Sequence, residues 1–321
     1  MRCIFFNLFI MLAALGPTRA SEKLPVVATF SILADMVQQV GGDRVTVTSL
    51  VGPGADAHTY SPAPSQVRLV ARAKLIVMNG LGFEGWMDRL GEAAGYSGPI
   101  VVATTGVDPL THDGDHEDHQ HQAEHQHTDD HQHEGDHQHE DAHDHGAVDP
   151  HAWQDMANAL IYIKNIRDGL CAIDQDNCPL YTANEAAYQS KISNLDAKLR
   201  QDFSAIPQAQ RKIITSHDAF GYFQAAYGLQ ILAPQGVSTD AEPSAASIAA
   251  LIRQIKHEQI RAVFVENITN SRVIDQIAQE TGAAIGGTLY SDALSDEAGP
   301  AATYLDMMQH NAQQMIAALK R

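Results

Sequence analysis

Residues 179–206, PLYTANEAAYQSKISNLDAKLRQDFSAI, decide the fold of this chain. Apolar residues recur along this stretch every three to five positions, which is close to the helical period. They are Ala187, Ile192, Leu195, Leu199 and Phe203. Pro179 can occupy the first turn of a helix, and Pro207 ends it. The stretch therefore predicts one helix of about 25 residues, on the order of 40 Å long at ~1.5 Å per residue.

Short β-rich runs alternate with amphipathic stretches on both sides of this helix. The predicted strands are 25–30, 45–51, 75–78 and 100–102 before it, and 211–215, 229–232, 262–265 and 284–285 with Leu289 after it. The predicted helices between them are 31–40, 65–73, 85–94, one near 153–171, 219–226, 244–257, 271–281 and 301–319. Two runs of this alternation indicate an α/β protein with two lobes, each with a largely parallel sheet, joined by one long rigid helix.

The first 20 residues, MRCIFFNLFIMLAALGPTRA, have one early arginine, an apolar run and small residues at Thr18 and Ala20. The apolar run is shorter than the ~17–25 residues that a membrane anchor needs. We therefore interpret it as a secretory signal that is cleaved after Ala20. The mature protein is then expected in the bacterial periplasm, with an N-terminal lobe at 21–178, the linker helix at 179–206 and a C-terminal lobe at 207–321.

Cys171 and Cys178 are the cysteines that remain after the signal. In an exported protein such a pair can form a small disulfide loop. Two free thiols are the alternative, and a zinc site is less favoured because no nearby histidine would complete it.

The formal net charge is −18, and a single histidine-rich stretch supplies much of it. This stretch carries many Asp and Glu residues and no Lys or Arg. An acidic chain is unsuited to nucleic acid and suited to cations. No nucleic-acid partner is therefore expected.

The histidine-rich stretch holds most of the 17 histidines of the chain. They are His112, His116, His119, His121, His125, His127, His131, His133, His137, His139, His143 and His145. Imidazole is a common metal ligand, so the stretch points to metal. Its polarity predicts a disordered loop over 111–146 that binds several metal ions weakly, unless it is merely a solvated acidic tether.

Three other histidines have contexts that favour a metal site. His58 and His217 each follow a predicted strand, and His151 precedes a predicted helix. Asp292 follows the last predicted strand, and ligands of open α/β sheets bind outside the carboxyl ends of strands. Three imidazoles and one carboxylate make a closed tetrahedral zinc site, and nitrogen-rich ligation favours zinc over manganese.

The chain resembles the zinc-binding proteins of bacterial ABC importers, the ZnuA type within the metal-binding cluster of solute-binding proteins. The matching segments are GADAHTYSPAPSQVRLVARA, NGLGFEGWMDRL, VDPHAW, TSHDAFGYF, APQGVSTDAEPSA, VFVEN and GTLYSDAL. The resemblance implies the two-lobe fold with a long helix, and it places the metal ligands at His58, His151, His217 and Asp292. Manganese members of the family tend to have Glu in place of His217, so this histidine points to zinc. The cysteine pair is outside the family's pattern.

The resemblance predicts a protein that captures zinc and delivers it to a membrane permease, with the histidine-rich loop as a collector or sensor of zinc beside the site. It implies the Zn²⁺ ion, the permease and a periplasmic zinc chaperone as partners, and a monomer. The alternatives are a secreted zinc hydrolase, with Asp218, Glu242 or Glu266 as the base, and a metal-dependent adhesin. A hydrolase would keep a metal position open for water, which a fourth ligand at Asp292 would close.

Overall fold

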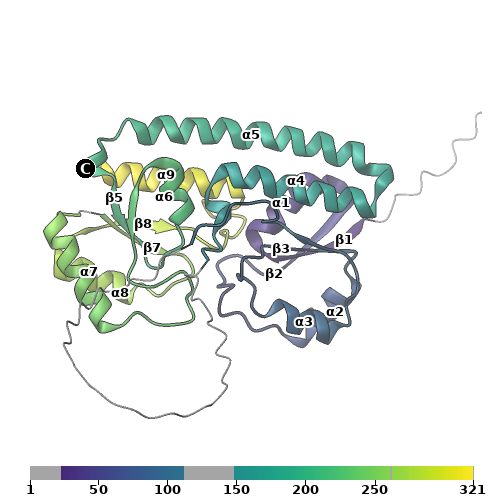
Figure 1. The fold of residues 1–321 in the computed structure, drawn as a ribbon, viewed down its shortest axis with the longest axis horizontal. Coiled ribbons are helices and arrows are strands. Elements are labelled where there is room, and N and C mark those ends of the chain that lie inside the picture. Colours follow the sequence, from purple (N-terminus) through teal and green to yellow (C-terminus); the bar gives the residue numbers. More distant parts are fainter. Residues whose placement is uncertain (1–22, 112–147, 261, 321) are drawn as a thin grey trace, which may run out of the picture.

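The computed structural model of the chain describes residues 23–111, 148–260 and 262–320 (Figure 1). Within these ranges no helix is both long enough and apolar enough to cross a membrane. The predicted signal peptide and the histidine-rich stretch lie outside the described residues.

The N-terminal lobe is built, in its described part, on a four-stranded parallel sheet with the strand order β2-β1-β3-β4. Its elements are β1 (Leu24–Phe30), α1 (Ser31–Gly41), β2 (Val45–Val51), α2 (Pro64–Arg72), β3 (Leu75–Met78), α3 (Met87–Ala94), β4 (Ile100–Val102) and α4 (Met156–Ile173). Figure 1 shows α1 and α4 on one side of this sheet and α2 and α3 on the other. Helices on both faces explain why the central strands β1 and β3 are largely apolar, whereas the edge strand β2 keeps Thr46, Thr48 and Ser49.

The C-terminal lobe repeats this plan, and its described residues form a second four-stranded parallel sheet with the order β6-β5-β7-β8. Its elements are β5 (Lys212–Ile214), α6 (Gly221–Tyr227), β6 (Gln230–Leu232), α7 (Ala245–Glu258), β7 (Ala262–Glu266), α8 (Arg272–Thr281), β8 (Ala284–Leu289) and α9 (Tyr304–Leu319). The predicted fold class, two α/β lobes joined by one long helix, is therefore confirmed.

The linker helix α5 (Cys178–Ser204) has 27 residues and runs along both lobes (Figure 1). It packs against α1 and α4 of the first lobe and against α6 and α9 of the second. Its buried side chains are Tyr181, Tyr188, Ile192, Leu199 and Phe203. The spacing of seven and four residues keeps them on one face of the helix, and two of them are tyrosines that the apolar count from the sequence left out.

A disulfide joins Cys171 at the end of α4 to Cys178 at the start of α5, as the sequence predicted. It fixes the sharp return between these two helices. The strand boundaries agree with the prediction to within a few residues, while some helices begin later than predicted. Helix α4 begins after Asp155, whose carboxylate accepts a hydrogen bond from the Ala157 N–H, and α9 begins after Thr303, which caps it in the same way.

One continuous apolar core extends through both lobes. It includes β1 and α1 of the first lobe and α6 and α9 of the second, and a smaller cluster lies between α7, α8 and the second sheet. Because the lobes share this core, the seam between the two sheets is packed by side chains of both lobes. That seam is where the predicted ligands lie.

Candidate metal centre

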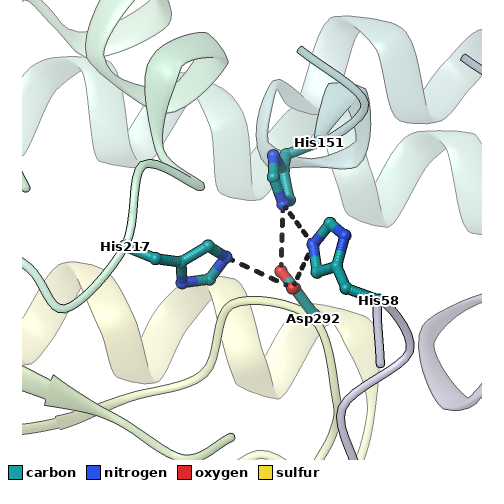
Figure 2. Close-up of side chains that lie close together, drawn as sticks. All are labelled: His58, His151, His217 and Asp292. Carbon is teal, nitrogen blue, oxygen red and sulfur yellow. Dashed lines mark hydrogen bonds and ion pairs between the residues drawn. The ribbon is translucent and has the colours of Figure 1, made fainter. Parts of the chain in front are cut away.

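The four predicted ligands come from four separate connections and meet between the lobes (Figure 2). His58 follows β2, and His151 lies just before the short 3-10 helix Ala152–Gln154 that leads into α4. His217 follows β5, and Asp292 follows β8. Three of the four therefore lie beyond the carboxyl ends of parallel strands, where the backbone leaves the sheet and side chains can converge.

The candidate ligand atoms form a small cluster centred on Asp292. One oxygen of this carboxylate lies 3.2 Å from His58 Nε2 and 3.3 Å from His217 Nε2, and the other lies 3.5 Å from His151 Nε2. The Nε2 atoms of His58 and His151 are 3.3 Å apart, and all four ligand atoms lie within 4.8 Å of one another. Figure 2 shows the three rings pointing toward the carboxylate from different directions.

These separations fit a four-coordinate ion. At zinc–ligand distances of ~2.0–2.2 Å, neighbouring corners of a tetrahedron are about 3.3–3.6 Å apart. Within the described residues, neither carboxylate oxygen of Asp292 nor Nε2 of His217 has a hydrogen-bond partner of good geometry, although all three atoms are buried. Buried polar atoms are normally satisfied, so this set is suited to hold a cation.

Burial separates one ligand from the other three. His151, His217 and Asp292 have no exposed surface, whereas the side chain of His58 is 5% exposed. A cavity of about 570 Å³ opens beside His58, with Trp86 and Arg89 among its lining residues. An ion can therefore approach the cluster from the His58 side.

Two further carboxylates orient the buried histidines. Asp149 Oδ1 lies 2.7 Å from His151 Nδ1 and also accepts a hydrogen bond from the His151 backbone N–H. Glu266 Oε2 lies 2.6 Å from His217 Nδ1, and its other oxygen accepts the backbone N–H of Ser216 and of His217. A proton held on each Nδ1 leaves each Nε2 lone pair facing the cluster, which is how outer carboxylates prepare metal-binding histidines.

The charges of the cluster perturb its own titration. Burial by itself lowers the pKa of His151, but the carboxylates of Asp292 and Asp149 outweigh it and raise the pKa to about 9. Burial likewise lowers the pKa of His217, and Glu266 and Asp292 raise that pKa well above its usual value. Burial alone would raise the pKa of Asp292, yet the two imidazoles hold it well below its usual range. The directions of these pKa shifts favour protonated His151 and His217 rings when no metal ion is bound.

Aromatic and amide side chains hold the ligand segments in place. The Phe83 ring packs edge-on against the His58 ring at 4.8 Å and against Trp153 at 4.9 Å. The Asn79 side chain donates to the Pro150 carbonyl, one residue before His151, at 2.8 Å. These contacts keep His58 and His151 on the rigid first lobe.

Two residues beside the cluster have roles that were not predicted from the sequence. Asp149 was not singled out, and Glu266 was named only as the base of a possible hydrolase. Both lie inside the segments VDPHAW and VFVEN, but nothing in those segments predicts which histidine each would contact. His257 is exposed and His310 contacts Tyr290 and the Thr288 carbonyl, so neither belongs to the cluster.

The chain at the two ends of the histidine-rich stretch leads to the mouth of the site. Thr111 and Val148 form an isolated antiparallel bridge, and Val148 and Pro150 line the cavity beside His58. The histidines of the stretch itself lie outside the described residues, so their ligand role stays a prediction.

Comparisons with known proteins agree with this architecture. The family profile described as the zinc-uptake complex component A, periplasmic, matches residues 26–318. The iron-binding protein YfeA of Yersinia pestis is 33% identical over 308 residues, covering 95% of this chain and 90% of that protein. The manganese-binding lipoprotein MntA of Halalkalibacterium halodurans is 30% identical over the whole of both chains. The solved periplasmic zinc-binding protein TroA of Treponema pallidum superposes with a TM-score of 0.79 at 29% identity, covering 94% of this chain and all of that one.

Proposed function

Because this chain belongs to the ZnuA family of periplasmic metal-binding components of ABC importers, we propose that its cargo is zinc, held by His58, His151, His217 and Asp292. The observation that carries the proposal is the buried cluster of three imidazoles and one carboxylate at tetrahedral spacing. Zinc captured there is delivered to the membrane permease of the importer.

The donor set supports zinc over the other metals of the family. Three nitrogens and one oxygen suit zinc, whereas manganese prefers more oxygen ligands. The family resemblance implies that manganese members tend to have Glu where this chain has His217. Glu266 and Asp149 contact Nδ1 of His217 and of His151, which leaves each Nε2 as a nitrogen ligand. Manganese and iron remain the competing cargoes because relatives are named for both metals.

The hydrolase alternative receives less support from the site. Glu266, one of its candidate bases, is taken up by His217 and two backbone amides. With Asp292 as a fourth ligand, zinc would have no open position for a water molecule. An adhesin would use the same fold. It would be recognised by binding of the protein to a surface, which would persist when metal transport is lost.

The histidine-rich stretch is proposed as a collector or sensor of zinc at the mouth of the site. Val148, which follows the stretch and pairs with Thr111 before it, lines the cavity beside His58, and the histidines of the stretch are too numerous to serve one ion. We propose further that the protein works in the periplasm after cleavage at Ala20, with a periplasmic zinc chaperone as a partner. A monomer suffices, because one chain supplies all four ligands.

Metal titration of the intact chain against a chain lacking residues 112–145 tests this proposal. All four proposed ligands lie outside the deletion, so we expect it to lower the total zinc stoichiometry and to leave one tight equivalent. A competing chelator gives the affinity of that equivalent for zinc and for manganese. Loss of all tight binding in the shortened chain would assign the site to the histidine-rich stretch instead.

The substitution His217→Glu tests the identity of the cargo. It replaces a nitrogen ligand by an oxygen ligand and should shift preference from zinc toward manganese. Asp292→Glu is the matched control because it changes side-chain length without changing ligand type. An intact protein that already prefers manganese in the same titration would contradict zinc as the cargo.

A further inference from the structure

A tyrosine hydroxyl of the second lobe reaches into the first lobe beside the cluster. Tyr222 lies in α6, in the segment that follows His217, and it is only 4% exposed. Its hydroxyl accepts a hydrogen bond from the Leu110 backbone N–H at 2.9 Å and donates one to the Asp149 carbonyl at 3.1 Å. One side chain thus fastens two segments of the other lobe.

These two segments are the arms at either end of the histidine-rich stretch. The Asp149 N–H donates to the Leu110 carbonyl at 2.9 Å, and Thr111 pairs with Val148 one step further out. Leu110 and Val148 are both more than one-third exposed, so the arms have little apolar packing of their own. An isolated pair of short strands is marginal in water and needs a further contact to persist. Tyr222 supplies that contact.

The inner arm leads directly to a proposed ligand. Asp149 is two residues before His151, and its carboxylate contacts both the ring Nδ1 and the backbone N–H of that histidine. Whatever fixes the backbone of Asp149 therefore also fixes the direction of His151 Nε2. Asn79 holds this segment from the first lobe, and Tyr222 holds it from the second lobe.

Resting on the proposed function, we propose that Tyr222 is a positioning residue for the metal site. It ties the Asp149–His151 segment to the lobe that carries His217. The His151 and His217 rings, with centroids 5.4 Å apart, thereby keep the separation that one shared ion requires. Tyr222 itself is not a ligand, because its hydroxyl is engaged by two backbone groups.

The test compares Tyr222→Phe with Tyr227→Phe in the full-length protein. Both changes remove one hydroxyl from α6, but the Tyr227 hydroxyl donates to Asp196 in the linker helix, away from the cluster. Zinc release is followed by stopped-flow mixing with an excess of chelator. We expect Tyr222→Phe to speed release roughly tenfold, the size of a net hydrogen-bond contribution, and Tyr227→Phe to change it less than about twofold.

A double-mutant cycle with His151→Ala separates positioning from a general structural role. If Tyr222 acts on the ion through His151, adding Tyr222→Phe to His151→Ala should change the zinc dissociation constant by less than about twofold. A structural role would lower affinity by the same factor in both backgrounds. The unfolding temperature of the metal-free variants, measured alongside, should fall about equally for the two tyrosine variants.

Wild-type release kinetics from Tyr222→Phe would overturn the inference, as would equal acceleration by Tyr227→Phe or full additivity with His151→Ala. The proposed function fails separately, if the wild-type protein itself holds no tightly bound zinc.

Discussion

The loops that carry Asp292 and His217 both follow strands of the C-terminal lobe, yet they differ in how hydrogen bonds hold them. The Asp292 loop is hydrogen-bonded to both lobes. Within its own lobe, Asn311 pairs with the Tyr290 backbone and Asn267 donates to the Ala293 carbonyl. The Ser291 carbonyl accepts from Trp153 and Gln154 at 3.0 Å each, and the Leu294 N–H donates to the Ser31 hydroxyl at 2.9 Å. His217 instead is held by Glu266 on β7, a strand of its own lobe.

The lobe to which a loop belongs along the chain is therefore not the only lobe that holds it in place. Asp292 comes late in the sequence, but its loop is also fastened to the lobe that carries His58 and His151. Of the four proposed ligands, His58 and His151 are held by the first lobe, His217 is held by Glu266 of the second lobe, and the Asp292 loop is tied to both. A relative movement of the lobes would change the distance between His217 and the two histidines of the first lobe.

Removal of His217 should have the largest effect on binding. His217→Ala leaves three of the proposed ligands and opens the fourth position. Its zinc affinity should fall by more than the roughly 10- to 100-fold that loss of an outer-shell partner costs. Competition with a chelator measures it, with His310→Ala as the control because His310 lies outside the cluster. Unchanged affinity in His217→Ala would remove this residue from the site.

Zinc binding should also depend steeply on pH. The raised pKa values of His151, about 9, and of His217 mean that both imidazoles are protonated at pH 7 in the metal-free protein. Zinc must displace both protons, so its affinity should rise by about two log units per pH unit near pH 7. Calorimetry in two buffers of different ionisation enthalpy counts the protons. Zinc binding to His217→Ala should release one proton fewer than zinc binding to the intact protein. If zinc binding to the intact protein released no protons, the raised pKa values would be contradicted.

The stability of the metal-free protein should show the opposite pH dependence. A histidine with a raised folded pKa contributes stability that is present below its unfolded pKa of ~6.5 and is lost as pH rises through the folded value, about 9 for His151. The unfolding temperature of the metal-free protein should therefore fall over this window. The zinc-loaded protein should keep its unfolding temperature, since its imidazoles are neutral and bound.

The substitution Glu266→Gln tests the contact between Glu266 and the His217 ring, which lies within the C-terminal lobe. It keeps the size of the side chain but weakens the charge-assisted contact to Nδ1. We expect a loss of zinc affinity of roughly 10- to 100-fold. Glu258→Gln is the control, because Glu258 pairs with Lys212 away from the site. Equal effects of the two substitutions would show that Glu266 does not tune His217.

The smallest effect is expected from the contact that holds Asp292. Gln154→Met removes one of the two donors to the Ser291 carbonyl while Trp153 keeps the other. The loss of about 1 kcal/mol corresponds to roughly fivefold faster zinc release. Gln38→Met removes a donor at the end of α1 and serves as the control. If the two variants release zinc at the same rate, the attachment of Asp292 to the first lobe is unimportant for binding.

The fold was predictable from the sequence because its signals are local. The strands are short apolar runs, and α5 has a helical period between two prolines. The helix starts were less accurate where a capping residue rather than an apolar pattern sets the boundary, as Asp155 and Thr303 do. A cap depends on one side-chain hydrogen bond, which hydrophobic periodicity does not report.

Some residues of the candidate site were predictable on physical grounds, some only by family resemblance, and some contacts not at all. His58, His217 and Asp292 follow strands, which is a physical reason to expect them together, whereas His151 precedes a helix and was joined to them by family resemblance. The attachment of the Asp292 loop could not be foreseen, because it uses a backbone carbonyl that any residue at position 291 would present. The Asp149 and Glu266 contacts depend on side-chain directions that emerge only in the folded chain.

The bridge between Thr111 and Val148 makes the histidine-rich stretch a replaceable module. Both ends enter and leave at one paired position, so exchanging what lies between them need not move any proposed ligand. Doubling the length of such a connection costs only about 0.6 kcal/mol in closure entropy. Evolution could therefore lengthen, shorten or rewrite this stretch to match the metal supply of a habitat. A protein engineer could use the same position to insert a fluorescent reporter beside a metal site.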